Sequence, residues 1–397
     1  MKINLFAIAI CIAFTSSGCA KTESTDEKID ALIAKMTVQE KAGQLNQYSG
    51  FEILTGDIDD SKISDRNQRI KNGLLGSVLN VLGTEDVEKA QRYAVEQTRL
   101  GIPLIFAFDV IHGYRTIFPI PLAESASWDL EAIERSARIA AIEASAAGQN
   151  WTFAPMVDIS HDPRWGRVME GAGEDPYLGG KIAQARVRGF QGNDLSQPDT
   201  IAATAKHFAA YGEVIAGREY NNVDISRRKL WETHLPPFKA ALDAGIKTFM
   251  NAFNEFEGVP ASANTYLIDD ILRGQWAFDG VLVSDWDSIG AMVTSGVIED
   301  DAGTAEMALE AGTDIDMESD VFVKYLPELV EQGRVDEALV DAAVKRVLRL
   351  KFELGLFDNP YQYINPEREK ALILAPEHRE AARDMARKSV VLLKNEN

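Results

Sequence analysis

The sequence predicts an α/β fold, a closed (β/α)8-type TIM barrel, from two observations. Apolar runs with the character of buried strands alternate along the chain with Ala-rich or amphipathic helical stretches, which is the pattern of a parallel sheet. Seven such strand-then-helix units follow one another, a number that favours a closed barrel over the alternative, an open doubly wound sheet. The expected strands cover residues 73–80, 103–110, 151–159, 201–208, 246–253, 281–285 and 313–317.

The composition is that of a globular chain with enough apolar residues for one large core or two smaller ones. Of its 397 residues, 46% are hydrophobic and 26% are charged. The formal net charge of −20 argues against nucleic acid and against an anionic membrane surface as partners, because both would repel the chain. We therefore expect no nucleic-acid partner.

The amino terminus is predicted to be a secretory signal covering residues 1–18. Lys2 precedes the apolar run 3–14, which is too short to span a bilayer as a mature helix. The small residues that end at Cys19 resemble a bacterial lipobox, which implies cleavage before Cys19 and a lipid anchor on it. A plain signal with an incidental cysteine is the alternative. Residues 19–28 would then form a tether, and the protein would lie in the periplasm, attached to a bacterial membrane through its lipid.

The barrel is expected to occupy residues 29–357. Two short helices lead into it, and the capping box Thr37-x-x-Glu40 marks the start of the second one. A long amphipathic helix over 335–354 ends the barrel and stops at Gly355, a residue type favoured just beyond helix ends.

Residues 358–397 are predicted to be a linker followed by the beginning of a truncated second α/β domain. Two Asn-Pro pairs, at 359–360 and 365–366, mark the linker as irregular. Residues 377–388 predict one more helix, and residues 389–395, which contain a Val-Val-Leu-Leu run, predict the opening strand of that domain.

Polar side chains at the ends of the expected strands predict where a functional site lies. Five successive strands end in ionisable or amide side chains: Asp109, Asp158, Lys206 with His207, Asn251 and Asp285. Because the carboxyl ends of barrel strands share one face, we expect these residues to line one pocket. The alternative is that every strand must end in something polar, and that Asp285 only caps the next helix.

The chemistry of this residue set fits a carbohydrate. The five histidines show no metal-ligand spacing and no Gly-rich loop precedes a helix, so we expect no metal and no cofactor. Carboxylates together with Arg, Lys and His grip vicinal hydroxyls through charge-assisted hydrogen bonds. Glycoside hydrolysis with retention needs a carboxylate nucleophile, for which Asp285 is the candidate. A rival from another class is a Schiff base on Lys206, as in an aldolase.

Four motifs in the same order resemble glycoside hydrolase family 3, of the periplasmic β-glucosidase type. They are FDVIHGYRT at 108–116, DPRWGRVMEGAGEDPYLGG at 162–180, KHFAAYG at 206–212 and VSDW at 283–286. The resemblance extends from about residue 30 to residue 397.

This resemblance implies a retaining, exo-acting β-glucosidase that removes terminal non-reducing β-D-glucosyl residues through a covalent glycosyl-enzyme on Asp285. The ligand would be a β-linked gluco-oligosaccharide or an aryl glucoside. The residues implied to contact the sugar are Asp109, Arg167, Lys206, His207, Met250 and Trp286. A β-xylosidase or β-glucan exohydrolase specificity is an alternative, and so is a lipid-anchored sugar-binding protein without catalysis.

The departures from the family pattern concern the groups around the nucleophile. Many members carry a Tyr where Phe253 stands, so a hydroxyl partner of the nucleophile is expected to be missing. The general acid of the glucosidase branch is a Glu on the second domain, so we expect it outside this chain and expect the chain alone to be weak or inactive. Glu213 or Glu219 would be the substitute acid if the chain turned over by itself. Glu170 and Glu174 are expected to be loop scaffolding.

Overall fold

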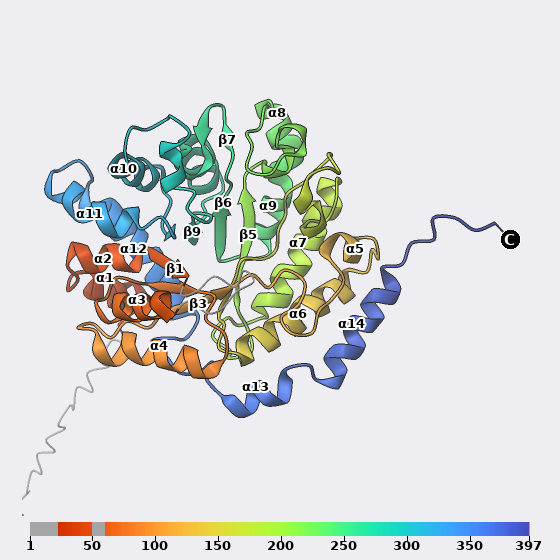
Figure 1. The fold of residues 1–397 in the computed structure, drawn as a ribbon, viewed down its shortest axis with the longest axis horizontal. Coiled ribbons are helices and arrows are strands. Elements are labelled where there is room, and N and C mark those ends of the chain that lie inside the picture. The colour runs from red at the N-terminus through yellow and green to blue at the C-terminus, as the bar shows by residue number, and fades with distance from the viewer. Residues whose placement is uncertain (1–22, 50–59, 397) are drawn as a thin grey trace, which may run out of the picture.

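The computed structural model describes residues 23–49 and 60–396, and a barrel of eight parallel strands forms the centre of this part (Figure 1). The strands are β1 (Asn46–Ser49), β2 (Ser77–Leu79), β3 (Ile105–Phe108), β4 (Trp151–Thr152), β5 (Ala202–Phe208), β6 (Thr248–Asn251), β9 (Val281–Val283) and β10 (Asp316–Met317). They are hydrogen-bonded in the order β10-β1-β2-β3-β4-β5-β6-β9. A parallel bridge between Val283 and Ile315 joins β9 to the segment that enters β10 and closes the ring. The predicted fold class is confirmed.

The first strand, β1, is the one that the hydrophobic pattern does not predict. Its sequence is Asn-Gln-Tyr-Ser, yet Asn46 and Gln47 are fully buried. Asn46 Nδ2 donates to the Leu74 carbonyl (3.2 Å) and Gln47 Nε2 donates to Ser77 Oγ (3.1 Å). Because these amides are hydrogen-bonded to neighbouring segments, they can be buried without the apolar run that normally marks a parallel strand.

The strand predicted over 151–159 is much shorter in the structure. Only Trp151 and Thr152 form β4, because Pro155 has no N–H to donate to a neighbouring strand. The chain nevertheless continues beside β5, where Val157 N donates to the Lys206 carbonyl (2.8 Å). Asp158 therefore enters the barrel mouth from an irregular segment and not from a strand end.

Helices cover the outside of the barrel between successive strands. Those of at least five residues with α geometry are α1 (Thr25–Ile33), α2 (Val38–Gln44), α3 (Asp60–Lys71), α4 (Thr84–Gln97), α5 (Pro121–Ser125), α6 (Leu130–Ala146), α7 (Pro176–Gln191), α9 (Leu235–Asp243), α10 (Asp301–Ala311), α11 (Val321–Glu331), α12 (Glu337–Glu353), α13 (Pro366–Leu372) and α14 (Pro376–Lys388). Helices α6 and α7 cross closely at Gly189, where an added Cβ would lie 2.4 Å from the Glu134 carbonyl oxygen. A short hairpin, β7 (Glu255–Phe256) and β8 (Val259–Pro260), follows β6.

The amino-terminal predictions are met only in part by the described residues. The predicted signal (1–18), Cys19 and the first part of the predicted tether lie outside them. Helix α1 begins at Thr25, so the last residues of the predicted tether are helical. The predicted capping box is present at the start of α2, where the Thr37 hydroxyl and the Glu40 carboxylate each accept the other residue's backbone N–H. Within the described residues, no helix is both long and apolar enough to cross a membrane.

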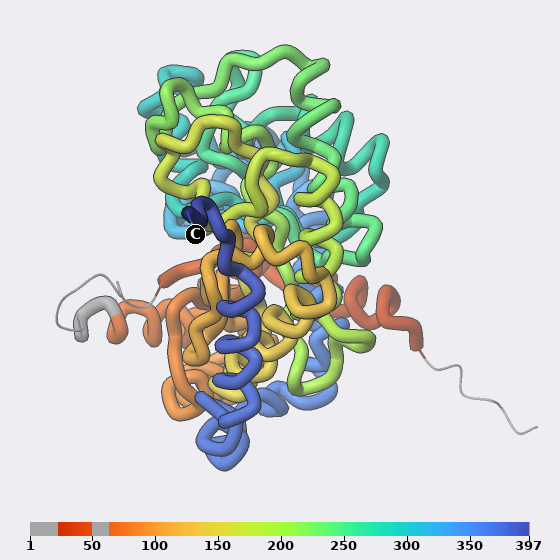
Figure 2. The backbone as a smooth tube through the Cα atoms, turned by 90° about the vertical axis from the view of Figure 1, so that its right-hand side faces the viewer, coloured from red at the N-terminus to blue at the C-terminus, as the bar shows by residue number. Residues whose placement is uncertain are grey.

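The carboxyl-terminal segment runs along the outside of the barrel against α6 (Figure 2). Asn365 caps α13, a helix in the stretch that the sequence predicts to be irregular. Helix α14 agrees with the helix predicted over 377–388. Residues 390–395 have no regular secondary structure and the apolar side chains from Val390 to Leu393 are exposed, so the strand predicted over 389–395 is not formed here. Whether a second domain begins here stays a prediction.

Candidate active site

Asp285 lies directly beyond β9, at the carboxyl end of the barrel. Its Oδ1 accepts from the backbone N–H of Trp286 (2.6 Å), and its Oδ2 lies 3.3 Å from His207 Nε2. Burial raises the pKa of Asp285 to about 6, although Lys206, the Trp286 amide and Arg167 act in the opposite direction. The side chain is only 13% exposed. The site therefore holds a poorly solvated carboxyl group that is ionised at neutral pH.

His207 connects Asp285 to a second buried carboxyl group, that of Asp158. Asp158 Oδ2 lies 2.7 Å from His207 Nδ1 and also accepts from the His207 backbone N–H (2.9 Å). Burial raises the pKa of Asp158 and lowers that of His207, because the interior disfavours the charged form of each. Asp158 thus fixes the orientation of the imidazole that faces Asp285.

Lys206 and Asp109 form an ion pair across the barrel mouth. Lys206 Nζ donates to Asp109 Oδ1 at 2.7 Å. The lysine comes from β5 and the aspartate follows β3, so the pair bridges over β4. The lysine side chain is buried, whereas the aspartate side chain is 46% exposed and has an oxygen free to meet a ligand hydroxyl.

Arg167 is held as a cation beside Asp285. Its guanidinium donates to both carboxylate oxygens of Glu170, at 2.8 and 3.0 Å, and the two residues share one short helical turn. Burial alone would lower the pKa of Arg167, but Glu170, Asp285 and Glu219 raise it. Glu170 therefore supports the arginine, as expected of a scaffold residue.

Glu219, which the sequence offers only as a substitute acid, is instead the centre of a hydrogen-bond network. It accepts from the Tyr211 hydroxyl (2.7 Å) and from the Trp165 indole N–H, and it lies 3.6 Å from Arg167 Nη1. The Tyr211 hydroxyl in turn accepts from the backbone N–H of Tyr220 (3.2 Å). This network fixes the loop after β5 against the loop that carries Arg167.

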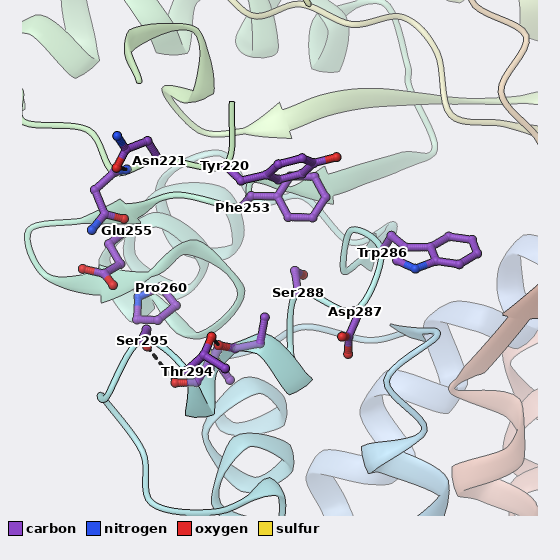
Figure 3. A pocket seen from close by; sticks show the side chains of 13 residues that line it. Tyr220, Asn221, Phe253, Glu255, Pro260, Trp286, Asp287, Ser288, Thr294 and Ser295 are labelled. Atoms are coloured by element: carbon purple, nitrogen blue, oxygen red, sulfur yellow. Dashed lines mark hydrogen bonds between the residues drawn. The ribbon is translucent and has the colours of Figure 1, made fainter. Parts of the chain in front are cut away.

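A pocket of about 560 Å³ is lined on one side by Trp286, Asp287 and Ser288, the residues that follow Asp285 in the chain (Figure 3). Three loops form it, which follow β5, β6 and β9. Trp286 lines the pocket and is 39% exposed, so its indole offers a face to a ligand at the boundary between the pocket and the Asp285 site.

Three neighbouring residues on and after β6 lie differently from one another. Met250 is buried in the hydrophobic core and pairs in register with Val283 of β9. Asn251 does not join the ionic residues of the site, because its amide donates to the Ala261 carbonyl (3.1 Å) and to Thr313 Oγ1 (3.2 Å). Phe253 packs between the rings of Tyr211 and Tyr220, and it has no hydroxyl for the nucleophile.

The structure thus brings Asp109, Arg167, Lys206, His207, Trp286 and Asp285 to one end of the barrel. Sequence reasoning missed Asp158 as the partner of His207 and Tyr220 as a pocket residue. The i, i+3 spacing of Arg167 and Glu170 was the one local signal of a partner. No group of three or more His, Cys, Asp or Glu side chains among the described residues is arranged to hold a metal ion.

Comparisons with known proteins agree with this arrangement. The chain matches the model of the glycosyl hydrolase family 3 N-terminal domain over residues 37–350. It is 41% identical over 376 residues to a periplasmic β-glucosidase of Salmonella typhimurium, which covers 94% of this chain and 48% of that protein. It is 35% identical over 425 residues to a putative β-xylosidase of Formosa agariphila, with coverage of 100% and 56%. The chain therefore spans about half the length of these relatives.

Solved structures give the same result. The β-glucosidase from Listeria innocua in complex with glucose is 42% identical, with a TM-score of 0.88, and covers 94% of this chain and 52% of that one. A mutant of that enzyme in complex with laminaribiose has a TM-score of 0.88 at 41% identity, with coverage of 93% and 52%. Because the family model matches most of its length, the chain belongs to glycoside hydrolase family 3.

Proposed function

We propose that this chain provides the sugar site and the nucleophile of a retaining, exo-acting β-glucosidase. The enzyme would remove terminal non-reducing β-D-glucosyl residues from β-linked gluco-oligosaccharides or aryl glucosides. The observation that carries the proposal is Asp285, a buried carboxylate with a pKa of about 6 beside the ionic groups of the barrel mouth. Similar proteins named β-glucosidases, one of them in complex with glucose, support the choice of sugar.

In this mechanism Asp285 attacks the anomeric carbon while the bond from that carbon to the leaving oxygen breaks. The leaving oxygen takes a proton from a general acid, and water then releases the sugar from Asp285. Asp109 and Lys206 would hold sugar hydroxyls through charge-assisted hydrogen bonds. His207 and Arg167 would stabilise the charge on Asp285, and Trp286 would border the sugar. Met250, which the sequence also suggests as a sugar contact, is buried in the hydrophobic core.

We infer that the general acid comes from outside the described residues. A general acid needs a raised pKa, but Glu170, Glu213 and Glu219 of the surrounding loops are each held in an ion pair. Burial would raise the pKa of Glu213, but Lys229 and His161 lower it. Arg167 likewise lowers the pKa of Glu170, against the effect of burial. Without the acid, hydrolysis of a substrate with a poor leaving group is expected to be about 10² to 10⁴ slower.

The alternatives make different predictions. A Schiff base needs Lys206 Nζ as its nucleophile, whereas that atom is already bound to Asp109 Oδ1 at 2.7 Å, so borohydride with a carbonyl substrate should trap nothing. A sugar-binding protein without catalysis should keep its affinity after Asp285→Asn. The likeness to a putative β-xylosidase keeps xylose as a second candidate sugar.

The test is the intact mass of the folded chain after incubation with a 2-deoxy-2-fluoro-β-glucoside that carries an activated leaving group. Such a group departs without a proton, so labelling does not need the general acid. We expect one adduct, mapped to Asp285, and none in Asp285→Asn. Asp279→Asn, an exposed carboxylate before β9, serves as the matched control and should label like the parent. Labelling of another residue, or no labelling by the glucose or xylose reagent, would contradict the proposal.

We further propose that the mature protein is attached to a membrane in the periplasm through a lipid on Cys19. The relative named as a periplasmic β-glucosidase supports the compartment. Incorporation of an alkyne fatty acid into the parent, and its loss together with release from the membrane fraction in Cys19→Ala, would support the anchor. Equal fractionation of both proteins would exclude it.

A further inference from the structure

We propose that Tyr211 is a positioning residue whose hydroxyl occupies the carboxylate of Glu219 and so keeps Arg167 available to the nucleophile. The inference rests on the proposed function of Asp285. It adds a fully buried residue that acts through two others, and it gives that residue control over the ionisation of the attacking carboxylate.

Arg167 is shared among three carboxylates, those of Glu170, Asp285 and Glu219. Its Nε and Nη2 donate to the two oxygens of Glu170, at 2.8 and 3.0 Å. Its Nη1 lies 3.6 Å from Glu219 Oε1, a loose ion pair without a hydrogen bond. Burial raises the pKa of Asp285, and Arg167 is one of the groups that lower it. A direct hydrogen bond to Glu219 would therefore turn the Nη1 protons of Arg167 away from the nucleophile.

The hydroxyl of Tyr211 occupies the oxygen of Glu219 that faces Arg167. It donates to Glu219 Oε1 at 2.7 Å, and this is the oxygen 3.6 Å from Arg167 Nη1. The other oxygen, Oε2, accepts from the indole N–H of Trp165. Burial and the Glu219 carboxylate raise the pKa of Tyr211, so the hydroxyl keeps its proton and remains a donor. Because two neutral donors satisfy this carboxylate, it does not need an N–H group of Arg167 as well.

The ring of Tyr211 is packed on several sides, which fixes where its hydroxyl lies. It contacts the rings of His207, Trp165 and Phe253, with centroids 5.1, 5.4 and 5.6 Å apart. Figure 3 shows Phe253 beside Tyr220, whose backbone N–H donates to the Tyr211 hydroxyl (3.2 Å). A phenylalanine at this position would keep the ring contacts and lose only the hydroxyl.

Removal of the hydroxyl changes no charge, yet it should change the ionisation of Asp285. Glu219 Oε1 would lack a donor, and Arg167 Nη1 could supply one from 3.6 Å away. Such a charge-assisted bond is stronger than the neutral bond that it replaces. Arg167 would then lower the pKa of Asp285 less than before. The other charged or titratable groups that face Asp285 stay the same: Lys206, His207 and Asp109.

The experiment measures the rate at which the 2-deoxy-2-fluoro-β-glucoside labels Asp285, as a function of pH. In Tyr211→Phe the midpoint should rise by about half a pH unit, so that labelling at pH 5 becomes roughly threefold slower relative to the plateau. Glu219→Gln removes the competing charge and should lower the midpoint by about as much. Tyr266→Phe is the matched control. Its hydroxyl accepts from the Trp231 indole N–H (2.9 Å) between two helical segments, and its loss should leave the midpoint unchanged.

A double variant separates this role from a merely structural one. With Glu219→Gln in place, the oxygen that Tyr211→Phe releases carries no charge, so the second substitution should no longer shift the midpoint. An unshifted or lowered midpoint in Tyr211→Phe alone overturns the inference, and so does an equal shift in the Glu219→Gln background. If Tyr211→Phe does not fold, an unshifted midpoint in Glu219→Gln overturns it.

Failure of the proposed function is distinguishable from failure of this inference. If the parent does not label at Asp285, the proposed function is contradicted. The ionisation of Asp285 is then followed by NMR of its side-chain carboxyl carbon, with Asp285→Asn to assign the signal. The same upward shift is expected in Tyr211→Phe by that route, and equal midpoints in the variant and the parent would exclude the positioning role.

Discussion

Two buried histidine–carboxylate pairs in this barrel are built alike and satisfied differently. His207 with Asp158 lies at the barrel mouth, and His378 with Glu143 lies where the carboxyl-terminal segment meets α6. In each pair Nδ1 approaches a fully buried carboxyl oxygen, at 2.7 Å and 3.0 Å respectively.

The Glu143 pair is fully satisfied. Besides His378, its carboxylate accepts from the backbone N–H groups of Arg115 (3.0 Å), Thr116 (2.8 Å) and Leu374 (3.0 Å), and from the Thr116 hydroxyl (2.6 Å). Burial would raise the pKa of Glu143, but the hydrogen bonds from Thr116, His378 and Arg115 lower it. This carboxylate thus joins the loop after β3 to the segment between α13 and α14.

The pair of Asp158 and His207 is not fully satisfied. Asp158 Oδ1 and His207 Nε2 are both buried, and neither has a hydrogen-bond partner among the described residues. Of these two atoms, His207 Nε2 faces Asp285, whose Oδ2 lies 3.3 Å away. The comparison teaches that one pair keeps an unused imidazole nitrogen beside Asp285, whereas the other uses its carboxylate fully to join two segments of the chain.

The largest expected effect on stability comes from breaking the pair of Glu143 and His378. Glu143→Ala leaves several buried donors without an acceptor and should lower the free energy of unfolding by about 3–5 kcal/mol. Urea unfolding measures it, and Glu143→Gln, which keeps one acceptor oxygen, should lose less. The molecules that remain folded should still label at Asp285. A loss below about 1 kcal/mol would remove the contrast between the two pairs.

Asp158→Asn should instead lower the labelling rate and leave stability nearly unchanged. Without the carboxyl group that orients His207, the rate of labelling by the fluoroglucoside should fall about 10- to 100-fold, because small displacements of groups at the reacting centre are costly. Stability should change by about 1 kcal/mol or less, since a carboxyl group that burial penalises is removed. A large loss of stability with an unchanged labelling rate would make Asp158 a structural residue like Glu143.

The pH dependence sharpens the comparison further. Labelling requires ionised Asp285, so its rate should rise with pH and level off above about 6, being roughly tenfold lower at pH 5 than at pH 7.

The raised pKa also means that the stability contributed by neutral Asp285 is present below pH 4 and is lost as pH rises through about 6. The effect of Glu143 on stability has the opposite sign. Its lowered pKa adds stability at pH values above the ordinary pKa of a glutamate, and that stability is lost as the pH falls into the acid range. A flat labelling rate between pH 5 and 7 would contradict the assignment of Asp285.

The smallest effect concerns the histidine of the satisfied pair. His378→Ala removes one of five hydrogen bonds to Glu143 and should lower the free energy of unfolding by about 1 kcal/mol. Its labelling rate should match that of the parent. His207→Ala is the matched variant in the other pair, and it should slow labelling far more than it destabilises the fold. Equal effects of both variants on labelling would show that the two pairs are not functionally distinct.

Much of the barrel could be predicted because burial on both faces leaves an uninterrupted apolar run. This holds for the strands around Ile105, Ala202, Thr248 and Val281, whose positions the pattern indicates. It fails for β1, since a polar strand can be buried when other segments satisfy it. It fails also at 389–395, because an apolar run forms a strand only beside a partner strand, and none pairs with it among the described residues.

By itself the sequence determined the fold class, the family and the presence of Asp285, Lys206 and His207 at strand ends. These follow from periodicity and from local motifs, which are properties of consecutive residues. Only the tertiary structure decided the partners: Asp158 and His207 are 49 residues apart, and Glu143 and His378 are 235 apart. Periodicity reports whether a side chain is buried, but which group satisfies it depends on how distant segments pack, and that choice separates the pair beside Asp285 from the pair at α6.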